Sequence, residues 1–102
     1  MKIVWSPLAI DRVVDIANWI ASDRPNVADR LVDELFQVVE RVGDFPQSGR
    51  MVPEFRQPNL REIVHREYRI IYRVSKNSVE VLTVRLSLQL LEEEDLGGEP
   101  GV

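Results

Sequence analysis

Cysteine is absent from this chain and histidine is nearly so. Among 102 residues there is no cysteine and a single histidine, His65. The absence of cysteine excludes a disulfide framework, a thiol nucleophile and a thiolate metal site. A single histidine excludes a two-histidine metal site and disfavours a Ser-His-Asp hydrolase. We therefore expect neither a metal ion nor a cofactor.

Long apolar runs are also missing. No stretch approaches the roughly 20 apolar residues of a membrane span, and the first residues, Met1 to Pro7, lack the apolar core of a secretion signal. The hydrophobic fraction, 44%, is ordinary for a folded domain. The length suits one domain that buries roughly two-thirds of its unfolded surface. We expect a cytoplasmic domain without membrane contacts.

Lysine is the third scarcity, because only Lys2 and Lys76 stand against eleven arginines. The net charge of −4 divides into −3 over residues 1–49, +4 over residues 50–85 and −5 over residues 86–102. Arginine is suited to bidentate contacts with carboxylate or phosphate groups. A basic middle between acidic ends predicts a positive functional face followed by a solvated acidic tail.

The first half of the chain predicts a short strand and two helices. Residues 2–5 are β-branched and aromatic, and Ser6-Pro7 is a helix start. Apolar residues then recur at helical spacing up to Ala21, and again between Pro25 and Gly43. The connection between the helices is only a few residues long, so they should form an antiparallel hairpin.

The second half predicts a loop and three strands. Residues 44–59 contain three prolines and read as an irregular loop, and strand-like runs follow at 60–65, 68–74 and 79–90. Short separators favour antiparallel hairpins. The order β-α-α-β-β-β predicts an α+β fold in which a helical hairpin packs on a mainly antiparallel sheet. We expect one domain over residues 1–91 and a flexible acidic tail over residues 92–102.

Alternation along the strands predicts which side chains share a face. Arg69 and Arg73 share one face of their strand, and Tyr68 and Tyr72 share the other, core-facing one. The arginine face should be free of helices, where it could bind phosphates or an acidic protein segment, or could be a solvated face paired with glutamates. Further along, alternation places five apolar residues on one face: Leu82, Val84, Leu86, Leu88 and Leu90.

Acid–base chemistry has little support in this sequence. His65 is the only side chain with a near-neutral pKa, and it stands at the expected end of a strand, where a structural role is the commoner one. The acidic run Glu92 to Asp95 lacks metal-ligand spacing and is more typical of a charged tail. The residues therefore do not assemble a convincing acid–base pair for RNA cleavage.

Several short motifs carry a family resemblance. They are Trp5-Ser6-Pro7-x-Ala9-x-Asp11, Asp15-Ile16-x-x-Trp19-Ile20-Ala21, Asp23-x-Pro25, Phe45-Pro46-x-x-Gly49-Arg50, Arg61-Glu62 and Tyr68-Arg69-Ile70-Ile71-Tyr72-Arg73-Val74. In this order and spacing the chain resembles ParE-type toxins of bacterial toxin–antitoxin pairs over roughly residues 3–85. The same fold occurs in RelE-type ribosome-dependent ribonucleases.

The resemblance implies a non-catalytic protein that binds and inhibits DNA gyrase, with no sequence-specific nucleic-acid contact of its own. It also implies a ParD-like antitoxin as the neutralising partner, bound in grooves around the helical hairpin and the sheet edge. RelE-type nucleases use a Lys/Arg-rich site and a C-terminal tyrosine, whereas residues 50–60 lack lysine and no tyrosine follows Tyr72. The candidate target contacts are Arg50, Arg56, Arg61 and Arg85.

The C-terminal segment departs from the family pattern. Relatives tend to continue as Arg-His-Ser-Arg-Gln, whereas this chain reads Arg85-Leu86-Ser87-Leu88-Gln89. Because this segment is implicated in toxin activity, Leu86 and Leu88 are candidate activity-modulating positions. Two alternatives stay open: a RelE-like mRNA endonuclease, and a non-toxic relic that still binds an antitoxin.

Overall fold

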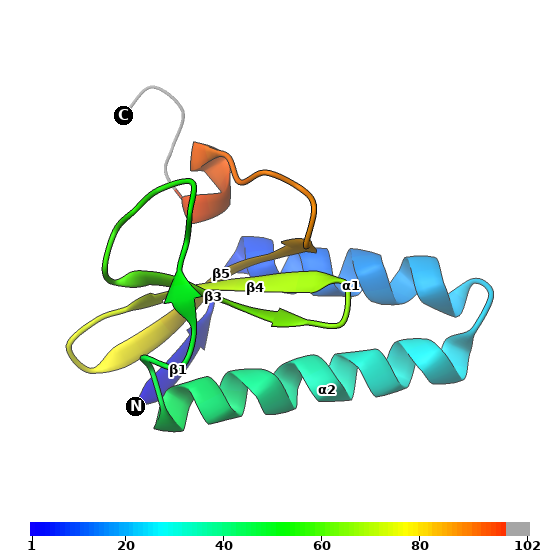
Figure 1. Cartoon of the computed structure of the whole chain (residues 1–102). Coiled ribbons are helices and arrows are strands. Elements are labelled where there is room, and N and C mark those ends of the chain that lie inside the picture. Colours follow the sequence, from blue (N-terminus) through cyan, green and yellow to red (C-terminus); the bar gives the residue numbers. More distant parts are fainter. Residues whose placement is uncertain (98–102) are drawn as a thin grey trace.

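A computed structural model describes residues 1–97 and shows two helices packed on one face of a five-stranded sheet (Figure 1). The strand order is β1-β5-β4-β3-β2. Strand β1 (Lys2–Trp5) runs parallel to β5 (Ser78–Leu86), and the other neighbouring strands are antiparallel. The predicted α+β class, with a helical hairpin on a mainly antiparallel sheet, is confirmed. Among the described residues, no helix is both long enough and apolar enough to cross a membrane.

The helical hairpin begins where the sequence signals place it. Helix α1 (Pro7–Ala21) is capped by Ser6, whose hydroxyl accepts from Ala9 N–H at 3.1 Å and donates to the Leu82 carbonyl at 2.8 Å. The same side chain therefore caps the helix and fastens its start to β5. Helix α2 (Pro25–Asp44) buries an apolar stripe against the sheet.

Three hairpin-connected strands follow α2. Strands β3 (Leu60–His65) and β4 (Tyr68–Val74) pair from Leu60↔Arg73 to His65↔Tyr68, and β4 then pairs with β5. The predicted ranges for these two strands are confirmed. The loop expected over residues 44–59 also contains a two-residue edge strand, β2 (Arg50–Met51), which pairs with β3.

Strand β5 differs from its prediction in two ways. It ends at Leu86, whereas we expected it to reach residue 90, because the chain turns at residues 87–89. A β-bulge also interrupts it: Ile71 pairs with Thr83 and Tyr72 pairs with Val81, so Leu82 is the extra residue. Consequently Val84 packs on the helix side and Leu82 on the opposite side. The predicted single apolar face from Leu82 to Leu90 is wrong.

The sheet has a core on each face. On the helix side, residues from both helices pack against β4 and β5. On the other side, Val52, Leu60, Ile71, Leu82 and Leu91 form a second buried cluster, with Phe55 and Leu96 packed against it. The loop after β2 and the segment after β5 supply its cover, and Figure 1 shows them beyond the sheet from α2. The arginine face is free of the α1–α2 hairpin as predicted, yet it is not a solvated surface.

The segment after β5 also differs from the expected flexible tail. Residues Glu93–Leu96 form a short 3-10 helix, η1, and Asp95 is fully buried. The segment starts as an acidic run in sequence but places one of its carboxylates inside the molecule. The last part of the expected tail, residues 98–102, lies outside the described residues.

Candidate functional site: the arginine face and its C-terminal strap

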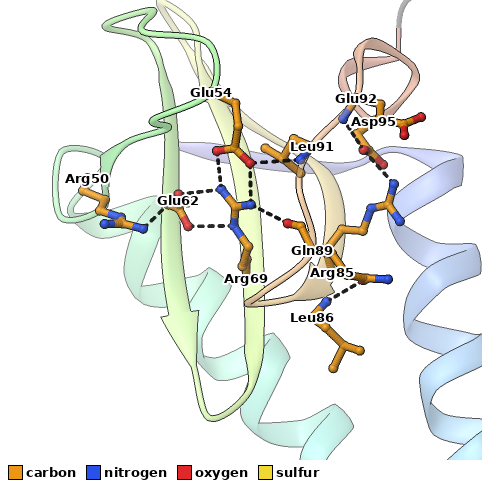
Figure 2. A network of polar contacts seen from close by, with 10 residues as sticks. All are labelled: Arg50, Glu54, Glu62, Arg69, Arg85, Leu86, Gln89, Leu91, Glu92 and Asp95. Carbon is orange, nitrogen blue, oxygen red and sulfur yellow. Dashed lines mark hydrogen bonds and ion pairs between the residues drawn. The ribbon is translucent and has the colours of Figure 1, made fainter.

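Residues 87–96, which we call the C-terminal strap, cross the sheet face that carries the arginines (Figure 2). The strap enters through a turn in which Ser87 N–H donates to the Glu67 carbonyl at 2.7 Å. It then contacts the sheet through two polar networks, one centred on Arg69 and one centred on Asp95. The strap therefore limits the access of solvent to this face of the sheet.

Arg69 is the centre of the first network and is only 4% exposed. Its guanidinium donates to both oxygens of Glu54, at 2.7 and 2.9 Å, and to both oxygens of Glu62, at 3.0 and 2.8 Å. It also donates to the Gln89 carbonyl at 2.8 Å, and Glu54 accepts from Leu91 N–H at 2.9 Å. Loop, sheet and strap are thus joined through one side chain.

Glu54 and Arg69 of this network favour their charged forms. Hydrogen bonds from Arg69 lower the pKa of the Glu54 carboxyl from 4.5 to about 2, against the opposing effect of burial and with help from Leu91 N–H. The same pairing with Glu54 raises the pKa of Arg69 above its ordinary value. Bidentate pairing satisfies most donors of the guanidinium, which is the condition for burying such a group without a large penalty.

Asp95 is the centre of the second network. It is 0% exposed, and its carboxylate pairs with Arg12 of α1 and, at 3.0 Å, with Arg85 of β5. It also accepts from Glu92 N–H at 2.8 Å. Burial alone would raise the pKa of the Asp95 carboxyl, but the donors from Arg85, Glu92 and Arg12 outweigh it and lower the pKa below the ordinary value.

The structure divides the predicted target contacts. Arg50 and Arg61 lie on the neighbouring strands β2 and β3, but the register places their side chains on opposite faces of the sheet. Arg50 Nη2 lies 3.5 Å from Glu62 Oε1, and Arg61 donates to the Gly49 carbonyl at 2.8 Å. Arg56 is exposed in the following loop with a φ of 27°. Arg85 lies opposite Arg69 in the strand register, but Asp95 holds its guanidinium. The strap therefore covers Arg85, but it does not cover Arg50, Arg56 or Arg61.

The two predicted activity-modulating leucines stand where β5 meets the strap. Leu86 is 44% exposed and Leu88 is 95% exposed. A surface groove of about 210 Å³ runs beside Leu86 and is also lined by Ile16, Tyr68 and Val84. Large apolar side chains that stay this exposed are suited to contact a partner.

His65 is tied to a structural contact. Its Nε2 lies 2.9 Å from Glu34 Oε1, and Arg66 contacts both oxygens of the same carboxylate at 2.9 and 3.0 Å. Hydrogen bonds from Arg66 and His65 lower the pKa of Glu34 to about 2. The cluster links α2 to the β3–β4 turn, so His65 positions elements of the fold.

Sequence reasoning allowed for glutamates beside the arginines, Glu62 among them, but it missed Glu54 and Asp95. Glu54, Glu62 and Asp95 pair with the arginines, but Glu54 lies in the loop and Asp95 in an acidic run, where neither carries a local signal of burial. The only hint was Arg69 itself, because an arginine between apolar neighbours of a central strand needs a carboxylate if both faces are covered. Within residues 1–97 no three His, Cys, Asp or Glu side chains are grouped to hold a metal ion.

Comparison with known proteins shows which proteins this chain resembles in sequence and in fold. A family model described as "ParE toxin of type II toxin-antitoxin system, parDE" matches residues 3–90. The curated protein "Putative toxin Y4kP" of Sinorhizobium fredii is 35% identical over 85 residues, which cover 81% of this chain and 84% of that protein. A chain of the solved "Chromosomal ParDE TA system from P. aeruginosa" matches with a TM-score of 0.70 at 17% identity, covering 84% of this chain and 95% of that chain.

The shared architecture is a small α+β domain with a helical hairpin on a mixed sheet, the fold of that P. aeruginosa chain. The family match spans nearly all of the described residues. The chain belongs to the ParE toxin family of type II toxin–antitoxin systems.

Proposed function

We propose that this ParE-family toxin acts in the cytoplasm by binding DNA gyrase, without catalysis, and is neutralised by a ParD-like antitoxin. The observation that carries the proposal is the family match over residues 3–90. The site supports a binding role, because its arginines are paired with carboxylates and the single histidine of the chain, His65, is engaged with Glu34. Arg50, Arg56 and Arg61 are the contacts we assign to the target.

The test of this target is supercoiling by purified gyrase in the presence of the toxin. We expect inhibition at micromolar toxin, relieved by an equimolar ParD-like antitoxin. The Arg50→Ala/Arg61→Ala variant should inhibit more weakly, by about tenfold for the loss of two charged contacts. Lys76→Ala is the matched control, since it removes an exposed cation from the β4–β5 turn. Unchanged supercoiling at micromolar excess, or ribosome-dependent message cleavage that is lost in Arg61→Ala, would contradict the proposal.

We assign to Leu86 and Leu88 a modulating effect on this activity. Leu88 is almost fully exposed, so the Leu86→His/Leu88→Arg variant should fold as the wild type does. If the leucines attenuate the toxin, bacteria that express the wild type without antitoxin should grow better than bacteria that express the variant. Equal growth of the two strains, at equal protein levels, would show that these leucines do not attenuate it.

A further inference from the structure

The C-terminal strap is fastened by few contacts. Leu88 and Leu90 are 95% and 76% exposed, and its apolar anchors are the buried Leu91 and the partly buried Leu96. The other attachments are polar, through Gln89 and Leu91 to the Arg69 network and through Asp95 to Arg12 and Arg85. A segment with so little buried apolar surface opens at a lower free energy than the strands beneath it.

The Asp95 pocket holds two guanidinium groups around one carboxylate, and Asp15, which lines the neighbouring groove, makes no ion pair among residues 1–97. One carboxylate faces two guanidinium groups that come from different elements, α1 and β5, and that are only 22% and 18% exposed. In addition, Arg85 Nε is buried and finds no hydrogen-bond partner among residues 1–97. Without Asp95 this pocket would be a ready carboxylate-binding site, because two converging guanidiniums with spare donors favour an anionic oxygen ligand.

We propose that the strap is an autoinhibitory latch in which Asp95 occupies, between Arg12 and Arg85, the position that a carboxylate of the target protein takes when the strap opens. Figure 2 shows part of this arrangement: Asp95 lies beside Arg85, and the strap residues Gln89 and Leu91 lie beside the Arg69 network. Opening frees Arg85 and uncovers the apolar patch formed by Ile71, Leu82 and their neighbours. An acidic protein surface with an apolar centre matches the uncovered face, and it competes with Asp95 for the same donors.

The latch proposal rests on the proposed function in one respect: it assumes that the face uncovered by strap opening contacts the toxin's target. Its energetic basis is independent of the target's identity. Replacing Asp95 by asparagine keeps the size of the side chain but leaves two guanidiniums without their anion. The partly buried charges are then better solvated in the open state, so the equilibrium between closed and open strap shifts towards the open one.

Native-state hydrogen exchange tests the opening directly. The amides of Leu91 and Glu92 report on the strap, because they donate to Glu54 and Asp95. In full-length Asp95→Asn we expect them to exchange at least about tenfold faster than in the wild type, a conservative figure for loss of a partly buried ion pair. Glu94→Gln is the matched control: it removes the same charge from η1, but Glu94 is exposed and makes no ion pair among residues 1–97.

A second variant guards against misfolding of Asp95→Asn. Leu96→Ala keeps every charge and removes only apolar contact between strap and sheet. It should speed the exchange of the same two amides by a smaller factor. In both variants the amide of Ile70, whose side chain belongs to the helix-side core, should still exchange far more slowly than the two strap amides, because it requires unfolding of the sheet rather than opening of the strap.

The functional readout is growth arrest on expression without antitoxin, at matched protein levels. Asp95→Asn, and to a lesser extent Leu96→Ala, should arrest growth at lower expression than the wild type and Glu94→Gln. If strap amides do not exchange faster, or if they do and toxicity stays equal or falls, the latch is overturned. If toxicity rises in Asp95→Asn while purified gyrase is unaffected by every variant, the gyrase proposal fails and the latch stands.

Discussion

Arg69 shows how a residue predicted for an open sheet face becomes one of the most buried charges of the molecule. Alternation along β4 assigns its face correctly, but its burial depends on Glu54 and on the strap, which are distant in sequence. Arg69→Leu would leave Glu54 and Glu62 facing each other without their shared cation. We expect the free energy of unfolding to fall by about 3 kcal/mol.

Urea denaturation measures this effect, and β4 provides its control. Arg73 lies four residues along on the same face, is partly exposed, and makes no ion pair within residues 1–97. Arg73→Leu should therefore change the unfolding free energy by no more than about 0.5 kcal/mol. Equal losses in the two variants would mean that the Arg69 network contributes no more than a surface arginine.

Glu54 makes the stability depend on pH. Its carboxyl has a pKa of about 2 in the folded chain, below the ordinary value of 4.5, so the folded state binds the proton less readily than the unfolded state. The stabilisation is therefore complete above about pH 5 and is lost as the pH falls from there towards 2. In Glu54→Gln the decline should be shallower, by about 1–2 kcal/mol over that range.

Thermal unfolding followed between pH 7 and pH 3 checks the Glu54 prediction. Glu94→Gln, which removes an exposed carboxylate, should keep the wild-type slope. A Glu54→Gln curve parallel to that of the wild type would show that the Glu54–Arg69 pair does not set the acid response.

Gly49 gives a physical reason for the Phe45-Pro46-x-x-Gly49-Arg50 motif. A Cβ atom at this position would lie 2.5 Å from both the Glu62 carbonyl oxygen and the Tyr72 hydroxyl. Both neighbours are fixed, since Gly49 N–H donates to that hydroxyl at 2.9 Å and β2 pairs with Glu62. Gly49→Ala should cost about 2–3 kcal/mol of unfolding free energy, measured by chemical denaturation.

Gly43 is the comparison for that substitution. A Cβ there would approach within 2.9 Å of Ile3 Cδ1, the movable end of a side chain, and alanine suits the helix better than glycine does. Gly43→Ala should therefore cost much less than Gly49→Ala. A larger loss at Gly43 would contradict the steric argument.

At the scale of elements, predictability follows how local each signal is. Ser6-Pro7 and Pro25 predict helix starts because a cap is a contact between neighbours in sequence. The β3–β4 hairpin follows from its two-residue separator. The bulge at Leu82 and the end of β5 at Leu86 had no such signal, because the apolar alternation continues through both. The turn into the strap depends instead on Glu67, Arg69 and Glu54, which only the folded sheet brings near.

The helical hairpin carries an exposed aromatic residue that suits the antitoxin. Trp19 is 80% exposed near the end of α1, where it lines a surface pocket with Ile20 and Val27. Tryptophan contributes strongly at protein interfaces when it fills a partner's apolar surface. Trp19→Ala should weaken binding of a ParD-like antitoxin by at least about thirtyfold, equivalent to roughly 2 kcal/mol.

Titration calorimetry with the purified antitoxin measures that affinity. Val14→Ala is the control, because Val14 is also an exposed apolar residue of α1, at 49%, but does not line this pocket. The melting temperature of free Trp19→Ala should match that of the wild type, since little of the side chain is buried. Undiminished affinity would place the antitoxin elsewhere on the toxin.

At the scale of the whole molecule, much of the positive charge is paired with carboxylates of the same chain. The basic middle of the sequence predicted a positive face, yet Arg50, Arg66, Arg69 and Arg85 each pair with a carboxylate of the same chain. Part of the compensating charge comes from the acidic C-terminal segment, through Asp95. The segmental charges of +4 and −5 therefore partly neutralise each other in space, which a linear count cannot show.

This arrangement predicts weak affinity for nucleic acid. Non-specific DNA binding comes from cations that neutralise phosphates, and guanidiniums already paired with carboxylates must lose those partners first. With a net charge of −4, the chain should bind a short labelled duplex with a Kd weaker than about 10⁻⁴ M at physiological salt, measured by fluorescence anisotropy. The variant Glu93→Gln/Glu94→Gln removes two exposed negative charges of the strap and should bind no more tightly. If only this variant binds DNA, long-range repulsion by the strap, rather than pairing of the arginines, excludes DNA from the wild type. Tight binding by the wild type would contradict the argument that paired arginines are unavailable to phosphates.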